Sequence, residues 1–266
     1  MVEVCVRDGF VAVEFKYELP FILPDRFVGE MLTEIEKLGK AEKLAFSLHG
    51  PYSNIGALLD SRWQGAVAEQ LEALEIAERL GAATYTVHCG WVEKKYASSE
   101  LVAECRNRVG RALRQMQASC DNVEICLENQ NSAEEGKINC AVTVPDLHEM
   151  ADLSNGLVGF TFDIGHANVL GVDPIDFFLA LGPDRVRVGH LHDNRGSEDD
   201  HLPLGQGNID WKAFLKEYLK RGCTFPLLLE LSTEEDFRCG KTLLDGLWAE
   251  AASRSFQPKS GAQLGG

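Results

Sequence analysis

Short apolar runs alternate with amphipathic stretches along most of the chain. The runs, each typical of a β-strand, are Val11–Phe15, Leu44–Leu48, Thr84–Val87, Val123–Leu127, Val158–Phe162, Val186–Gly189 and Leu227–Leu229. Between them, apolar residues recur at helical spacing, as at Val67, Leu71, Leu74 and Ala77 before the helix stop at Gly81. Strands that are apolar throughout and alternate with helices indicate βαβ units and a parallel sheet.

Two further helical stripes support this alternation. The first comprises Leu101, Cys105, Val109, Ala112 and Met116. The second comprises Trp211, Phe214, Leu215, Tyr218 and Leu219. Asp210 is placed as the N-cap of the second helix and Gly222 as its end. Seven βα units are therefore clear from the pattern.

The N-terminus does not follow the pattern. Val2–Val6 could form an eighth strand, but only Arg7, Asp8 and Gly9 separate it from the next run, which is the length of a hairpin link. Either the first strand is antiparallel or the barrel lacks its usual first βα unit. We predict an α/β fold of the TIM (β/α)8-barrel type, with an atypical N-terminal hairpin as one alternative. Residues 1–254 form its single domain, and residues 255–266, rich in Gly, Ser and Gln, form a frayed tail.

Composition narrows the classes of partner. The chain has 266 residues, with 26 basic and 41 acidic side chains and a net charge of −15, which disfavours general nucleic-acid binding. No apolar run approaches the roughly 18 residues of a membrane-spanning helix. The eight cysteines show no C-x-x-C spacing and follow no signal peptide. We interpret them as reduced, mostly buried thiols of a cytoplasmic protein.

Chemistry-bearing residues end six consecutive apolar runs. They are His49, His88, Glu128, Asp163, His190 and Glu230, separated by 27 to 40 residues, about one βα unit each. In a barrel these strand ends converge on the ring where TIM-barrel active sites lie. A solvated strand end explains any one of these residues, but it does not explain six in register.

Four of the six form a natural set of metal ligands: Glu128, Asp163, His190 and Glu230. Three carboxylates and one imidazole suit Mn, Mg, Co, Fe or Zn as a divalent ion. Glu128 and Glu230 can face each other across the ring. Two opposed carboxylates near a metal are suited to moving a proton on and off carbon.

A second layer of polar residues follows these strand ends. His166 lies three residues beyond Asp163, and His192, Asp193, Asp199 and His201 follow His190. One interpretation is a second metal site that contains His166, Asp199 and His201. The alternative is that His166 and Arg195 bind substrate hydroxyls or phosphate, while Asp199 and His201 order the loop.

The ordered segments GFVAVEF, SLHGPY, VHCG, LENQ, FDIGHAN, HLHDN, DDHLPLGQGNIDW and LLLEL resemble the xylose isomerase-like TIM-barrel superfamily. That superfamily includes sugar phosphate isomerases and epimerases, ketose 3-epimerases and endonuclease IV-type nucleases. The resemblance, which runs from about Gly9 to Leu231, implies that Glu128, Asp163, His190 and Glu230 hold the shared metal. It also implies that Glu128 and Glu230 are the acid/base pair and that His166 contacts substrate.

The nuclease branch implies further zinc ligands: His88 beside Glu128, and His166, Asp199 and His201 together. The second-site prediction accordingly contains His88, His166, Asp199 and His201. Departures count against that branch. A histidine expected after SLHGPYSN is absent, because Ile55, Gly56 and Ala57 occupy the stretch, and HLHDNR replaces the nuclease form. His49 is expected to line the pocket without binding metal.

The sequence therefore predicts a divalent-metal-dependent isomerase or epimerase acting on a small sugar, sugar phosphate or related polyol. The metal is Zn, Mn, Mg or Co, with one ion at the quartet and a second or third left open. Substrate binding is assigned to His49, His166 and Arg195. The alternative is an endonuclease IV-like zinc phosphodiester hydrolase acting on abasic DNA, and the third hypothesis is a barrel that binds metal or ligand without turnover.

Overall fold

Seven parallel β-strands form the centre of the protein in the computed structural model, which describes residues 2–17, 30–131 and 136–255. The strands are β1 (Ala12–Lys16), β2 (Ala45–His49), β3 (Thr84–Val87), β5 (Glu124–Glu128), β7 (Gly159–Asp163), β8 (Val186–Leu191) and β9 (Leu227–Leu229). They pair in that order, each parallel to the next. All seven strands predicted from the apolar runs are therefore confirmed.

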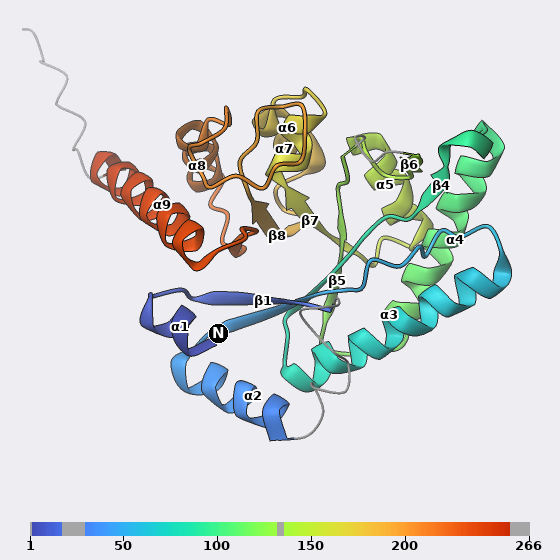
Figure 1. The fold of residues 1–266 in the computed structure, drawn as a ribbon, viewed down its shortest axis with the longest axis horizontal. Helices are drawn as coiled ribbons and strands as arrows, with labels where there is room; N and C mark the ends of the chain where they lie inside the picture. Colours follow the sequence, from blue (N-terminus) through green and yellow to red (C-terminus); the bar gives the residue numbers. More distant parts are fainter. Residues whose placement is uncertain (1, 18–29, 132–135, 256–266) are drawn as a thin grey trace, which may run out of the picture.

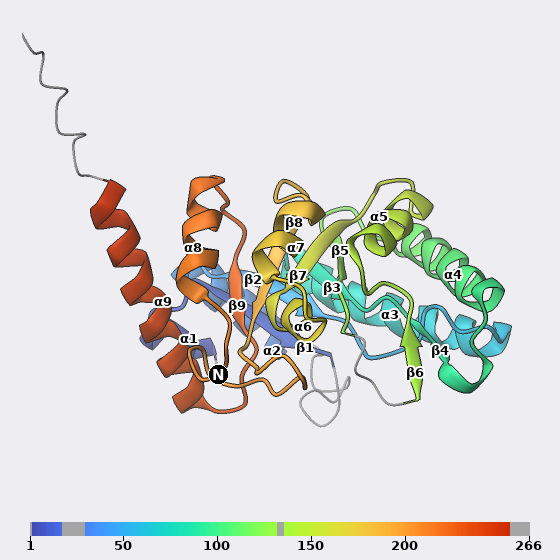
Figure 2. The ribbon, with the colours of Figure 1, turned by 90° about the horizontal axis from the view of Figure 1, so that it is seen from above.

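Helices surround these strands on the outside (Figure 1). They are α1 (Val2–Arg7), α2 (Glu30–Glu42), α3 (Asp60–Leu80), α4 (Ser99–Gln117), α5 (Val144–Leu153), α6 (Ile164–Val169), α7 (Pro174–Leu181), α8 (Trp211–Lys220) and α9 (Glu234–Ser255), with the 3-10 turn η2 (Lys94–Tyr96). Strands β4 (Trp91–Glu93) and β6 (Lys137–Asn139) form a separate antiparallel ribbon beside the barrel (Figure 2). The helix limits follow local signals. Gly81 ends α3 in the left-handed conformation at φ 73°, and the Asp210 side chain accepts a hydrogen bond from Ala213 N at the start of α8.

The barrel is nearly closed between its first and last strands. β1 and β9 are neighbours in space but share no strand pairing. An ion pair crosses the junction, with Nζ of Lys16 3.0 Å from Oε1 of Glu230. The strands are buried on both faces, as β3 and β7 show along their whole length. The prediction of a TIM-type α/β barrel is confirmed.

Of the two alternatives left open for the N-terminus, the hairpin is wrong, because residues Val2–Arg7 form helix α1. Alternating valines suggested a strand, but Val2 and Cys5, one helical turn apart, both pack against the core. The helix ends where Gly9 adopts φ 74° and Phe10 N donates to the Cys5 carbonyl. Tertiary packing therefore outweighs the strand propensity of valine.

The cysteines agree with the prediction of reduced, mostly buried thiols. All eight are free, and five of them are buried. In the described part of the chain, no helix has the length and apolar character needed to cross a membrane. The tail predicted from residue 255 on lies outside the described residues except for Ser255, the last residue of α9.

Asp193 organises the long loop between β8 and α8. Its carboxylate is fully buried and accepts hydrogen bonds from Gly205 N at 2.8 Å, from the Trp211 indole at 2.9 Å and from Asn194 N at 3.0 Å. A single carboxylate thus gathers donors from both ends of the loop. One sequence interpretation gave Asp199 and His201 the role of ordering this loop. The contacts of Asp193 show that this residue also holds the loop in place.

Asp193→Ala is expected to destabilise the protein by about 3 kcal/mol, because buried donors would lose a charged acceptor. Urea unfolding measured by circular dichroism tests this. Asp210→Ala is the matched control, since it removes only an exposed helix cap and should cost about 1 kcal/mol. Equal losses for the two variants would contradict the role given to Asp193.

Candidate metal centre

A cavity of about 470 Å³ opens at the carboxyl ends of the strands. Predicted site residues form much of its wall: His49, His88, Glu128, His166, Asp199, His201 and Glu230. Four of them end or directly follow strands β2, β3, β5 and β9, and the other three lie after β7 and β8. The parallel strand order explains this convergence, because all the carboxyl ends point to one face of the barrel.

The predicted quartet converges beside this cavity. Candidate ligand atoms of Glu128, Asp163, His190 and Glu230 all lie within 4.8 Å of one another. Nδ1 of His190 lies 3.0 Å from Oε1 of Glu128 and 3.6 Å from Oε1 of Glu230. Asp163 and His190 are completely buried, whereas the two glutamates also reach the cavity.

The hydrogen bonds of Asp163 leave one carboxylate oxygen for an ion. Oδ1 accepts from His166 N at 2.7 Å and lies 3.2 Å from Nε2 of His192. Oδ2 is buried and accepts no hydrogen bond from the described residues. A buried carboxylate oxygen without a donor is costly unless a cation faces it. Together with an oxygen-rich ligand set, this observation shows that the quartet fits a divalent ion.

Glu14, in the middle of β1, orients the histidine of the quartet. Its Oε2 lies 2.9 Å from Nε2 of His190, and its Oε1 accepts the Ser47 hydroxyl at 2.7 Å. The contact turns Nδ1 of His190 toward Glu128 and Glu230, which is how carboxylates commonly orient metal-binding histidines. Sequence reasoning missed Glu14. The available signal was a charged residue inside an otherwise apolar strand.

Glu14→Ala is expected to weaken Mn²⁺ binding by about 10- to 100-fold, because the His190 ring would lose its orienting partner. Isothermal titration calorimetry with MnCl₂ measures this. Glu124→Ala is a suitable control, because Glu124 begins β5 at the opposite end of the barrel and pairs with Arg187. If both variants bound Mn²⁺ as the unmodified protein does, Glu14 would have no role in the centre.

The electrostatic field at the quartet favours positive charge. Burial lowers the pKa of His190, but the carboxylates of Glu14 and Glu230 outweigh burial and raise that pKa well above its ordinary value. Lys16 shows the same balance: burial lowers its pKa, and the neighbouring carboxylates, led by Glu230, raise it more. A site that stabilises a protonated imidazole also stabilises a divalent cation.

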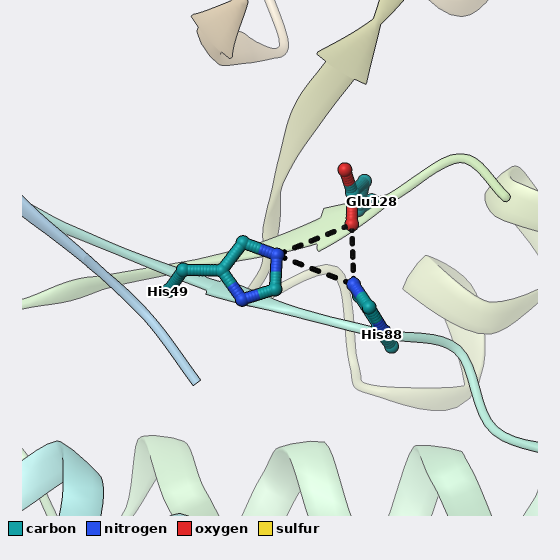
Figure 3. A group of neighbouring side chains, drawn as sticks. All are labelled: His49, His88 and Glu128. Carbon is teal, nitrogen blue, oxygen red and sulfur yellow. Dashed lines mark hydrogen bonds and ion pairs between the residues drawn. The ribbon is translucent and has the colours of Figure 1, made fainter. Parts of the chain in front are cut away.

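A second group consists of His49, His88 and Glu128, from three adjacent strands (Figure 3). Nε2 of His88 lies 2.9 Å from Oε2 of Glu128 and 3.2 Å from Nε2 of His49. Nδ1 of His49 donates to the Gly50 carbonyl at 2.9 Å, so Nε2 is the ring nitrogen that faces this group. No histidine stands at Ile55, Gly56 or Ala57, but His49 is the third member of this group, whereas the sequence interpretation placed it only in the lining of the pocket.

Asp199 forms the third group, with His166 and His201. Its Oδ2 lies 3.2 Å from Nε2 of His166 and 3.6 Å from Nε2 of His201. Nδ1 of His166 donates to the Asn129 carbonyl at 2.8 Å, and Nδ1 of His201 donates to the Glu230 carbonyl at 2.9 Å. In each ring Nε2 is therefore the nitrogen that faces Asp199. Loss of the Nε2 proton would leave a lone pair there that is suitable for binding a metal.

The structure divides the four residues of the predicted second site. His88 lies with His49 and Glu128, the pairing that the nuclease resemblance implied, rather than with Asp199. His192 also lies beside Asp199: it is fully buried, stacks on His201 at a ring distance of 3.9 Å and lies 3.4 Å from Oδ1 of Asp199.

Arg195 does not reach this centre. It is exposed and lies outside the described lining of the cavity. Its backbone carbonyl accepts a hydrogen bond from Asn208 in the β8–α8 loop. Lys16, at the end of β1, lines the cavity instead. Sequence reasoning missed Lys16 because the apolar run of β1 was taken to end at Phe15.

Comparisons with known proteins agree with this geometry. The chain is 28% identical over 206 residues to the uncharacterized protein MJ1311 of Methanocaldococcus jannaschii, a match that covers 74% of this chain and 68% of that protein. Among solved structures, a D-tagatose 3-epimerase-like protein superposes with a TM-score of 0.82 at 23% identity, covering 93% of this chain and 91% of that one. Endonuclease IV from Thermus thermophilus superposes with a TM-score of 0.71 at 22% identity, covering 94% of this chain and 93% of that one.

These structural likenesses establish a shared fold. The sequence pattern that defines the family described as the xylose isomerase-like TIM barrel matches residues 2–255, almost the whole chain. The ordered strand-end motifs predicted this membership. The chain belongs to the xylose isomerase-like TIM-barrel family.

Proposed function

We propose that the protein is a divalent-metal-dependent isomerase or epimerase that acts on a small sugar, sugar phosphate or related polyol. One observation carries the proposal. Of the four quartet residues, only Glu128 and Glu230 line the cavity, while Asp163 and His190 are buried behind them. Two residues are therefore placed to hold an ion, and two carboxylates are placed to meet both the ion and a substrate.

The quartet of Glu128, Asp163, His190 and Glu230 would hold the ion, which would polarise a carbonyl oxygen of a bound sugar. One glutamate carboxylate removes a proton from the carbon beside that carbonyl, and the other returns a proton to the opposite face. His88 and Gln130 fix the Glu128 carboxylate, since their Nε2 atoms lie 2.9 and 3.0 Å from its Oε2. Because the Glu128 carboxylate is held in place, it needs little movement to exchange a proton with the substrate carbon.

The shape and charge of the site support a small substrate. The cavity, of about 470 Å³, lies within the range of small-molecule pockets. The net charge of −15 does not favour a polyanionic nucleic acid. The named likeness to a D-tagatose 3-epimerase-like protein is consistent with this proposal.

A second candidate is an endonuclease IV-like phosphodiester hydrolase. Its supporting observation is that two further groups of candidate ligands accompany the quartet: His49, His88 and Glu128, and Asp199 with His192 and His201. Further ions at these groups would suit the hydrolysis of a phosphodiester. We propose the quartet as the secure ion site and these two groups as candidates for weaker ions.

Metal content separates the two candidates first. The full chain, loaded separately with Zn²⁺, Mn²⁺, Mg²⁺ or Co²⁺ and passed through a desalting column, is analysed for bound ion by plasma mass spectrometry. One retained ion per chain favours the isomerase, and two or three favour the hydrolase. No retained ion of any kind would refute both proposals.

Activity assays then test the chemistry. Ketopentoses, ketohexoses and their phosphates are incubated with loaded protein in D₂O, and deuterium at carbon is followed by NMR. Cleavage of a duplex with one abasic site is assayed in parallel. Metal-free protein is the control for both assays. We expect deuterium incorporation above this control; cleavage of the abasic duplex alone would establish the second candidate.

A further inference from the structure

Lys16 lies beside one of the two carboxylates of the proposed proton transfer. It is the last residue of β1 and is paired in register with His49 on β2. Its Nζ lies 3.0 Å from Oε1 of Glu230, one of the two proton-transferring carboxylates. Among the described residues that line the cavity, Lys16 is the one lysine or arginine.

The Lys16 ammonium has donors to spare. It carries three N–H groups, and the described residues give it one ion-pair partner, Glu230. Its side chain is 41% exposed and faces the cavity, whereas the Glu230 side chain is 8% exposed. A substrate oxygen entering beside Glu230 would therefore meet an ammonium donor.

Charge balance gives Lys16 a specific purpose. The carboxylates of Glu128, Asp163 and Glu230 and the neighbouring carboxylate of Glu14 together carry four negative charges, so one divalent ion leaves two of them uncompensated. The Lys16 ammonium offsets part of this remaining charge. An oxygen that becomes negative beside Lys16 is then stabilised by the ammonium.

We propose that Lys16 is a catalytic residue that binds the substrate oxygen on which negative charge develops when a carbon-bound proton leaves. This inference rests on the proposed isomerase or epimerase function. A glutamate carboxylate takes the proton, the C–H bond breaks, and its electron pair moves onto the carbonyl oxygen, giving an enediolate. Lys16 donates a hydrogen bond to that oxygen and keeps its own proton. Return of a proton to carbon from a glutamate restores the carbonyl.

Oxalate is the probe for this role, because it is planar and presents two adjacent anionic oxygens as an enediolate does. The full chain is loaded with Mn²⁺ and titrated with oxalate by calorimetry. Lys16→Met is expected to weaken oxalate binding by about 10- to 100-fold, the loss of one charged hydrogen bond. Lys16→Arg should bind more tightly than Lys16→Met, since it retains the charge. Lys94→Met, at an exposed lysine of η2, should bind as the unmodified protein does.

Mn²⁺ affinity is the second readout. Lys16→Met should bind Mn²⁺ at least as tightly as the unmodified protein, because a neighbouring positive charge has been removed. If Lys16 only closed the gap between β1 and β9, the Lys16→Met variant would have lower thermal stability and unchanged oxalate affinity. If the Met variant does not fold, Lys16→Gln removes the same charge.

The outcomes separate this inference from the proposed function. Equal oxalate affinity in the unmodified protein and the Lys16→Met or Lys16→Gln variant would overturn the role of Lys16 and leave the metal centre standing. Absence of oxalate binding to the Mn²⁺-loaded, unmodified protein would overturn it too. Absence of Mn²⁺ binding itself would overturn both the inference and the proposed function.

Discussion

Asp163→Ala is expected to lower the affinity for the first divalent ion by at least about 100-fold. This loss exceeds the usual effect of removing a residue that only orients a metal ligand, because Asp163 is proposed as a ligand itself. Asp163 is completely buried, and its Oδ2 has no hydrogen-bond donor among the described residues. Removing it takes away a ligand that no neighbouring side chain replaces. Calorimetric titration with Mn²⁺ and Zn²⁺ measures the loss.

Folding effects must be separated from metal loss in this experiment. Asp163 also caps helix α6 by accepting from His166 N, so its loss costs about 1 kcal/mol of stability. Asp163→Asn keeps a neutral oxygen that can still cap helix α6. It should therefore lower the affinity for the ion while preserving the fold. Asp152→Ala, at an exposed residue of α5, serves as the unrelated control. Unchanged Mn²⁺ affinity in Asp163→Ala would remove Asp163 from the centre.

Most of the barrel strands were predictable because they are buried on both faces, as β3 and β7 are along their whole length. A parallel strand with helices outside and packed side chains inside appears as an uninterrupted apolar run, and its limits are visible where polar residues resume. Glu128 and Asp163 stand at such limits, as the final residues of β5 and β7. The same polar residues that mark the strand ends therefore form the centre, and one pattern predicted both.

The N-terminal helix was not predictable in the same way. Val2, Val4 and Val6 alternate as in a strand, while Val2 and Cys5 also match a single helical turn. A segment this short satisfies both periodicities, and only its packing decides between them. In the folded protein Asp8, just after α1, pairs with Arg238 of α9 at 2.8 Å. No local pattern announces a contact between such distant residues.

The grouping of the histidines depends on strand order rather than on spacing. His88 follows β3, which lies between β2 and β5, so its neighbours are His49 and Glu128. Asp199 follows β8, several strands away around the barrel. The resemblance to the nucleases implied this separation, and the sequential strand order gives its physical reason. The position of Arg195, by contrast, depends on a loop path that the buried Asp193 sets and the sequence does not reveal.

Glu230→Gln is expected to reduce turnover of the sugar identified by the D₂O screen by about 10²- to 10⁴-fold, the usual contribution of a positioned acid or base. Glutamine keeps the shape and one oxygen of the side chain, so saturating metal should still fill the quartet. The amide cannot accept a proton from carbon. Turnover rates are measured at several Mn²⁺ concentrations to confirm saturation.

Isotope exchange makes this prediction specific to two opposed carboxylates. In Glu230→Gln, Glu128 still removes and returns a proton on its own face of the substrate, so one epimer should exchange with D₂O without being converted. Glu128→Gln should show the mirror pattern, with exchange confined to the other epimer. Both glutamates line the cavity, and their Oε1 atoms lie 3.0 and 3.6 Å from Nδ1 of His190, so a substrate bound there would meet both carboxylates. If one variant lost exchange from both epimers while the other kept exchange from both, a single carboxylate would serve both faces and the two-base assignment would be wrong.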